Sequence, residues 1–193
     1  MPILFWCFLS INCRRRILNM KIWSIAFMFI LLYGCNVKQE DIKEVLYWNN
    51  RSITFVPDLL LKVQGHDTLI AGYPDKKYKI LVYVGPYGCS SCQLNLYTWQ
   101  YLIDSLQISH PEMDVVFVVN VLDFKEFEYF AKTNKFKHPV FYDTKGTFAK
   151  TNKFPSNKTV QVLFLNEDNK VVLVGNPLKN GNILKVFYKL ITE

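Results

Sequence analysis

Residues 79–93 read KILVYVGPYGCSSCQ, an apolar run of strand-forming residues followed by a turn and two cysteines separated by two residues. The run Lys79 to Val84 has the composition of a buried strand, and we expect a helix from Ser91 onward. At the first turn of a helix, free backbone N–H groups and the helix dipole favour a thiolate on the first sulfur. The arrangement therefore indicates thiol–disulfide exchange by Cys89 and Cys92.

The length and composition of the chain favour one well-cored domain with appendages. The chain has 193 residues and half of them are apolar, which is enough for one core but short for two independent domains. The formal net charge is +7, but residues 1–34 carry four basic residues and no acidic one, which leaves +3 on the remainder. Basic residues in that remainder are scattered among acidic ones, so we expect no nucleic-acid partner.

The amino-terminal segment has the layout of a secretory signal. A short positive region at Met20-Lys21 precedes an apolar run from Ile22 to Tyr33, which is too short for the ~20 residues that span a bilayer core. Residues 32–35 read LYGC and resemble the lipobox of bacterial lipoproteins. The resemblance implies that residues 1–34 are a signal segment, with its start at Met20, and that Cys35 carries lipid. A plain signal peptide and an uncleaved anchor are the alternatives.

The use of cysteine agrees with a single reactive pair outside the cytoplasm. Only Cys89 and Cys92 fall in the part of the chain that we expect to be globular. With lipid on Cys35, the protein would be anchored to a membrane of the bacterial cell envelope and would face the periplasm or the cell exterior.

Downstream of Cys35, the pattern of elements changes near residue 75. Residues 35–74 are expected to form an N-terminal extension, with a tether at Asn36–Asp41, a helix at Ile42–Trp48 and strands at Ile53–Val56, Leu59–Val63 and Leu69–Ile70. Residues 75–193 are expected to form the main domain. Its strands are predicted at Lys79–Val84, Val115–Val121, Pro139–Tyr142, Val160–Leu165 and Lys170–Val174, and its helices at Ser91–Leu106, Asp123–Thr133, Thr147–Thr151 and Asn182–Ile191. This order predicts an α/β fold with a mixed central sheet flanked by helices.

Two segments downstream of the cysteine motif carry further features of the same family pattern. Residues 138–143 read HPVFYD before a short helix, and residues 163–172 read LFLNEDNKVV across the expected hairpin. Together with the strand, the CxxC pair and the helix, they resemble the thioredoxin-like superfamily, in particular envelope thiol–disulfide oxidoreductases of the TlpA and ResA kind. The resemblance covers residues 75–193 and implies a thioredoxin-like three-layer sandwich with an N-terminal extension.

The resemblance also implies a role for each residue around the motif. Cys89 would be the exposed attacking thiol, and Cys92 would be the more buried thiol that resolves the mixed disulfide. The residues expected to tune the redox potential or to contact substrate are Ser90, Ser91, Pro86, Thr159 and Val160. The implied partners are protein thiols and disulfides together with an unidentified redox partner, and no cofactor or metal is expected.

Two positions depart from the family pattern. Thr159-Val160 stands where thioredoxins usually have a cis proline directly before the hairpin strand. Tyr83 stands where thioredoxin has a buried acid that assists proton transfer to the resolving cysteine. The backbone of Thr159 could still pair with a bound peptide, because β-pairing does not require the proline.

Other interpretations of the cysteine pair stay open. A zinc site needs four ligands, but no second CxxC exists and His66, His110 and His138 are widely scattered. A peroxidatic cysteine typically follows a Thr or Ser by three residues, and Pro86 stands there. A structural disulfide would close so small a ring that it contributes little loop-closure stabilisation. The main alternative function is a lipoprotein binding module with a thioredoxin-like fold and a structural disulfide.

Several prominent side chains are expected to pack rather than to react. His138 precedes Pro139, which favours extended backbone, so a surface or packing role is expected. Aromatic residues on the helix after the motif, Tyr97, Trp99 and Tyr101, are expected to serve the core and its rim. Those on the next helix are expected to form a buried face: Phe124, Phe127, Tyr129 and Phe130.

Overall fold

The computed structural model describes residues 36–87, 94–155 and 160–192. The predicted signal segment and Cys35 lie outside these residues. The chain divides into two compact units between Tyr47 and Trp48. Helix α2 (Asn36–Trp48) begins at Asn36, so the segment predicted as a tether is helical. No helix in the described ranges is long and apolar enough to cross a membrane.

The second unit is built on one mixed sheet. Within the described residues the sheet has seven strands in the order β2-β1-β5-β4-β3-β6-β7. The strands are β1 (Leu60–Val63), β2 (His66–Asp67), β3 (Tyr78–Val84), β4 (Met113–Val119), β5 (Val140–Tyr142), β6 (Val160–Leu165) and β7 (Val171–Val174). Strands β3, β4 and β5 are parallel, whereas β1, β2, β6 and β7 run antiparallel to their neighbours. The predicted mixed sheet is therefore confirmed.

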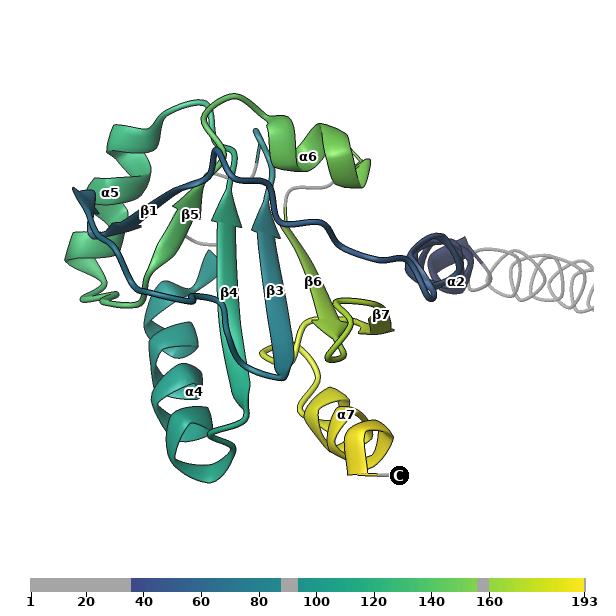
Figure 1. Cartoon of the computed structure of the whole chain (residues 1–193). Coiled ribbons are helices and arrows are strands. Elements are labelled where there is room, and N and C mark those ends of the chain that lie inside the picture. The colour runs from purple at the N-terminus through teal and green to yellow at the C-terminus, as the bar shows by residue number, and fades with distance from the viewer. Residues whose placement is uncertain (1–35, 88–93, 156–159, 193) are drawn as a thin grey trace, which may run out of the picture. The chain divides into compact units, whose positions relative to one another are not determined.

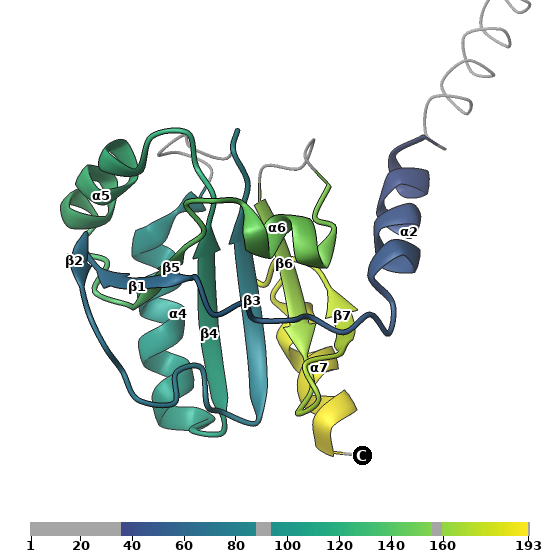
Figure 2. The ribbon, with the colours of Figure 1, turned by 45° about the horizontal axis from the view of Figure 1, so that its top comes forward.

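Two apolar clusters lie on opposite faces of this sheet. The helical face is covered by α4 (Leu96–Ser109), α5 (Phe124–Thr133) and α7 (Asn182–Thr192), through buried residues such as Trp99, Phe127 and Phe187. The opposite face is covered by the short helix α6 (Thr147–Asn152) and by the segment that leads to β1. Figure 2 shows this segment crossing the strands on the side away from α4 and α7. We call the second surface the loop-covered face.

The segment that covers this face differs from the prediction. Residues Ile53–Val56 do not form a strand, and only the neighbouring Ser52 makes an isolated bridge, to Lys170. Ile53 is buried, and Phe55 and Val56 pack on the loop-covered face, so their apolar character reflects covering rather than pairing.

The hairpin at the sheet edge is shorter than predicted. Its strands join through Gln64 and Gly65, which both have positive φ, at 50° and 85°, as a two-residue turn between paired Val63 and His66 requires. The second strand is therefore His66–Asp67, and Leu69–Ile70 lies outside it. Strand β1 pairs with β5, so part of the expected N-terminal extension continues the central sheet.

The helix after the motif is interrupted. A continuous helix from Ser91 to Leu106 was expected, but α4 begins at Leu96 with Asn95 as its N-cap. Asn95 adopts left-handed φ and ψ of 45° and 55°, which asparagine tolerates, and its side chain accepts a hydrogen bond from the hydroxyl of Thr98 at 2.8 Å. Strand β4 begins at Met113, two residues before the predicted start. The predicted elements from Asp123 onward agree with the structure within one residue at each end.

Candidate functional site

The candidate site lies at the carboxyl ends of the parallel strands. Figure 1 shows these strand ends on one side of the sheet, beside α6. Beyond β3 the structure describes Gly85, Pro86 and Tyr87, and the chain resumes at Leu94, which is buried against the helical face. The six residues between Tyr87 and Leu94 are therefore bounded by a strand end and by a buried leucine. This interval lies outside the described residues and contains Cys89, Ser90, Ser91 and Cys92. Thr159 also lies outside the described residues, in the range 156–159.

The two predicted contact residues that are described lie at this edge. Val160 is the first residue of β6 and is paired with Val84, the last residue of β3. Pro86 follows two residues later and is half-buried, whereas Tyr87 is 70% exposed. The structure thus brings the start of β6 next to the strand that leads into the motif.

Backbone and side-chain bonds tie the strand ends together. The Asn120 N–H donates to the Val84 carbonyl at 2.8 Å, and the Asp143 N–H donates to the Val119 carbonyl at 2.8 Å. The buried Asp143 carboxylate also accepts from the backbone N–H groups of Phe148 at 3.2 Å and Ala149 at 3.0 Å. Asp143 therefore holds the first turn of α6 at the strand ends. The sequence analysis missed this role, although an Asp between a strand and a short helix is a recognisable capping signal.

Tyr83 is a neutral residue in the loop-covered face. It is 2% exposed and stacks on Phe154 at 4.0 Å between ring centroids and on Phe148 at 6.4 Å. Burial, and secondarily the negative charge of Asp143, raise the pKa of Tyr83 to about 12. The phenol therefore stays protonated near neutral pH, so Tyr83 cannot replace the buried acid of thioredoxin as a base.

Gln161 lies beside Tyr83 on the adjacent strand. The two residues are paired across β3 and β6, and Gln161 is 1% exposed. Its Oε1 accepts a hydrogen bond from Nε1 of Trp48 at 3.0 Å. Because the indole N–H can only donate, the amide oxygen must face Trp48, and this fixes which side-chain atom is nitrogen.

The nitrogen of this carboxamide is unusual. Nε2 of Gln161 has no hydrogen-bond partner among the described residues. A buried donor without a partner costs about 1–3 kcal/mol. The sequence analysis missed Gln161, although a single amide within the apolar strand VQVLFL was a visible signal.

His138 lies away from the strand ends and has a packing role. It is buried, its Nε2 contacts the Val115 carbonyl, and the hydroxyl of Tyr73 lies 3.1 Å from the same nitrogen. Burial lowers the pKa of His138 to about 4, although the backbone hydrogen bond to Val115 opposes this shift. Of the two predicted roles, packing is confirmed.

The exposed aromatic residues correct part of the packing prediction. Trp99 is fully buried, but Tyr97 and Tyr101 on the same helix are largely exposed. On α5, Phe127 is buried as predicted, whereas Tyr129 is 72% exposed. Tyr129 follows Phe127 by two residues, which places it on the solvent side of the helix.

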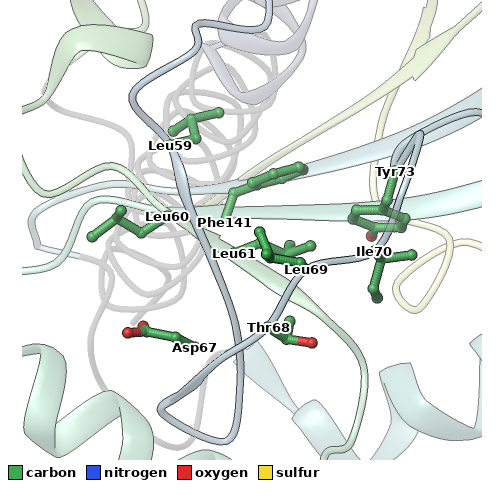
Figure 3. A pocket seen from close by; sticks show the side chains of 9 residues that line it. All are labelled: Leu59, Leu60, Leu61, Asp67, Thr68, Leu69, Ile70, Tyr73 and Phe141. Carbon is green, nitrogen blue, oxygen red and sulfur yellow. The ribbon is translucent and has the colours of Figure 1, made fainter.

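A groove at the sheet edge offers little chemistry. It has a volume of about 760 Å³ and lies between the β1–β2 hairpin and the segment that follows it (Figure 3). Its lining is apolar except for Asp67 and Thr68, and the lining residue Leu69 is fully exposed. In the part of the chain that the structure describes, no three His, Cys, Asp or Glu side chains are grouped as metal ligands would be.

Comparisons with known proteins identify the fold. No protein-family model matches the sequence, and no curated protein matches it. A candidate protein disulfide isomerase from Bacteroides thetaiotaomicron aligns with a TM-score of 0.55 and 12% identity over 75% of this chain and 92% of its own. A thiol-disulfide oxidoreductase from Bacteroides fragilis aligns with a TM-score of 0.51 and 11% identity over 70% and 99%. A thioredoxin-like protein in the oxidised form aligns with a TM-score of 0.52 and 13% identity over 74% and 97%.

At 11–13% identity these likenesses show the fold alone. As the resemblance implied, the chain has a thioredoxin-like fold with an N-terminal extension.

Proposed function

We propose that this protein is a thiol–disulfide oxidoreductase of the cell envelope that exchanges disulfides with protein substrates. The observation that carries the proposal is the position of the CxxC sequence, whose first cysteine follows the last residue of β3 by five residues in a thioredoxin-like fold. Two of the structures to which the chain is similar are described as a candidate protein disulfide isomerase and a thiol-disulfide oxidoreductase, which supports the same activity.

The proposed reaction uses the two cysteines in sequence. The Cys89 thiolate attacks one sulfur of a substrate disulfide, which forms a mixed disulfide and releases the other substrate sulfur as a thiolate. The Cys92 thiolate then attacks the sulfur of Cys89 and releases the second substrate thiolate. The substrate gains two electrons, and the protein is left with a Cys89–Cys92 disulfide. A partner dithiol restores the reduced form, and the reverse sequence would oxidise a substrate.

The residues near the cysteine pair would tune its redox potential or contact the substrate. Ser90 and Ser91 would tune the potential through hydroxyl and N–H groups near the sulfurs. Pro86, Thr159 and Val160 would contact the substrate, and the paired position of Val160 beside Val84 supports this assignment.

We also propose that residues 1–34 are removed as a signal segment and that Cys35 carries lipid. Residues 35–74 would then connect the anchor to a thioredoxin-like domain at residues 75–193, in the periplasm or at the cell exterior. Labelling of cells with a clickable fatty acid tests this proposal, with a Cys35→Ser variant as the matched control. Label on the wild type and none on the variant is expected; an unlabelled wild type would exclude lipidation.

A second function is a lipoprotein binding module that keeps its cysteines as a structural disulfide. The neutral, buried Tyr83 favours it, because no acid at this position can assist proton transfer to the resolving thiol. The two functions differ in whether the disulfide is readily reduced.

Trapping and redox titration distinguish the two functions. A Cys92→Ala variant should accumulate mixed disulfides with envelope proteins, because the resolving step is blocked, and a Cys89→Ala/Cys92→Ala double variant should accumulate none. The reduction potential of the wild-type pair should lie within the range of about −120 to −270 mV that redox-active CxxC proteins span. Absence of trapped partners, with a potential below about −300 mV, would favour the structural disulfide.

A further inference from the structure

Three asparagine residues in the described loops form the same local turn. In each, the side-chain oxygen accepts a hydrogen bond from the backbone N–H two residues later: Asn166 from Asp168 at 3.1 Å, Asn176 from Leu178 at 2.9 Å and Asn180 from Asn182 at 3.1 Å. This arrangement is an Asx-turn. The bond closes a ring that contains both the side-chain amide carbon and the backbone nitrogen of the residue in between. The reactivity of the amide therefore depends on that intervening residue.

The intervening residue differs between the three turns. Pro177 has no N–H, and Glu167 carries a side chain next to its nitrogen. Gly181, which follows Asn180, has neither restriction, and a Cβ placed on it would meet no atom within 4 Å. Asn180 and Gly181 are both exposed, and the Gly181 N–H donates no hydrogen bond to any described residue. The Gly181 nitrogen is therefore free to react with the neighbouring amide.

We propose that Asn180 is a site of deamidation. The inference does not depend on the proposed function. Hydroxide takes the proton of the Gly181 N–H, and the nitrogen attacks Cγ of Asn180. The new N–Cγ bond replaces the Cγ–Nδ2 bond, and ammonia leaves with a proton from water. The hydrogen bond that Oδ1 accepts from the Asn182 N–H stabilises the negative charge that develops on this oxygen during the attack.

The cyclic imide that results has two outcomes. Water that adds at Cγ opens the ring to aspartate, which leaves the main chain unchanged. Water that adds at the former backbone carbonyl opens it to isoaspartate, in which the main chain runs through the former side chain and the carbonyl becomes a carboxylate. No oxidant or cofactor is needed, because water is the only co-reactant. The two products differ in what they do to the backbone.

The backbone of Asn180 holds the start of α7. Its carbonyl accepts a hydrogen bond from the Ile183 N–H at 3.1 Å, and Ile183 packs so closely on Gly175 that a Cβ there would clash with it. Isoaspartate removes this carbonyl from the main chain and adds a methylene, so the turn cannot keep both of its bonds. Aspartate keeps them and places a negative charge near the first turn of α7, which has no acidic residue.

A displaced α7 would lose contacts with the helical face of the sheet. Phe187 is fully buried, and its ring lies 4.8 Å from that of Phe164. Tyr188 stacks on His110 at 4.0 Å between ring centroids. We therefore expect the isoaspartate form to be less stable than the unmodified protein, and the aspartate form to be at least as stable.

Ageing of the purified, folded protein in mildly alkaline buffer tests the inference. Tryptic cleavage after Lys179 and Lys185 releases the peptide that contains Asn180. Tandem mass spectra should place the change from amide to acid at Asn180, and isoaspartyl methyltransferase should label this peptide. Asn166 and Asn176 are internal controls with the same turn and should keep their amides. Deamidation of Asn166 at the same rate would show that Gly181 is not the determinant and would overturn the inference.

Two further comparisons show whether the fold permits the reaction. Gly181→Ala should slow deamidation severalfold, because its methyl group obstructs the attack, and the open space around Gly181 accommodates it. The wild type unfolded in urea gives the rate without the turn, and the folded protein should react at least as fast. If only the unfolded chain reacts, the turn protects Asn180 and the inference is wrong.

The effect on α7 is measured on the separated products. The isoaspartate form, isolated by chromatography, should unfold at a lower urea concentration than the unmodified protein. Asn180→Asp is the matched control, because it adds the charge without the altered main chain, and it should unfold at the wild-type concentration or above. An isoaspartate form that unfolds as the wild type does would show that Asn180 does not hold α7 in place.

Discussion

The two faces of the sheet are built differently. The helical face is dominated by apolar side chains, with the buried His138 beside Phe117 and Phe136, and α4, α5 and α7 close it. The loop-covered face is closed by α6 and an irregular segment, and it contains polar residues among its aromatic rings. Because side chains alternate along a strand, Lys79 shares this face with Tyr83 on β3, and Gln161 shares it with Leu163 on β6.

This difference indicates a division of tasks between the faces. An apolar helical layer gains stability from area removed from water, and it needs no specific partners. The loop-covered face must satisfy each buried polar group, so its sequence is constrained by individual hydrogen bonds. A polar group that remains unsatisfied on such a face therefore lowers the stability of the fold.

The largest expected effect is a core truncation on the helical face. Trp99 is fully buried, and its ring meets Phe117 edge-on at 5.5 Å. We expect Trp99→Ala to lower the free energy of unfolding by about 3–5 kcal/mol. Urea denaturation measures this loss. The matched control is Tyr97→Ala on the same helix, where the side chain is 68% exposed and the change should stay within about 0.5 kcal/mol.

Truncation of a buried aromatic residue on the loop-covered face tests whether the two faces contribute differently to stability. Phe154 contacts the rings of Trp48, Tyr83 and Phe148, but it keeps 9% exposure and lies beyond the end of α6. We expect Phe154→Ala to be less destabilising than Trp99→Ala, because water can reach the vacated space. A greater loss from Phe154→Ala would show that the loop-covered face carries the stability.

Acid should destabilise the protein through His138. Its pKa is lowered to about 4 in the fold, so the unfolded chain binds a proton more readily than the native protein does. The stability due to neutral His138 is present above pH ~6.5 and is lost as the pH falls toward 4, by an amount of about 3 kcal/mol.

The pH dependence can be assigned with one variant. His138→Phe keeps an aromatic ring but cannot titrate, so the difference in unfolding free energy between neutral pH and pH ~4 should shrink relative to the wild type. An unchanged difference would mean that other groups cause the acid sensitivity.

Removal of a fully bonded carboxamide should have an intermediate effect. Asn152→Ala leaves the Thr54 N–H without its acceptor and removes two further bonds, so we expect a loss of about 1–3 kcal/mol. Thr151→Ala, at the exposed neighbouring position on α6, is the control for helix propensity. Equal effects of the two substitutions would show that the bonds to Thr54 contribute little.

Sequence reasoning succeeded where one local pattern decides the structure. Strand β3 is a continuous apolar run because it is buried on both faces, and α5 begins after Asp123 because that side chain caps it. It failed at Ile53–Val56, because apolar residues that cover a face and apolar residues in a strand look alike in sequence. The break at Asn95 was also missed, since a capping asparagine within a helical pattern gives only a weak signal.

At the candidate site, too, the sequence predicts local features but not long-range contacts. The position of Tyr83 and the pairing of Val160 with β3 follow from the order of elements, and both could be predicted. Gln161 could not be assigned a role, because its partner Trp48 is 113 residues away in the sequence. A long-range hydrogen bond leaves no periodic pattern, so a buried amide in an apolar strand resembles a tolerated exception until the fold is known.

The smallest expected change in stability is that of Gln161→Leu. The substitution loses the bond from Trp48, but it also removes a buried donor that has no described partner, so the two effects oppose each other. We expect the free energy of unfolding of the oxidised protein to change by less than about 1 kcal/mol in urea. A loss as large as that of Asn152→Ala would mean that Nε2 is bonded in the native disulfide form. Gln161 would then be a structural group like Asn152, with both of its side-chain atoms bonded.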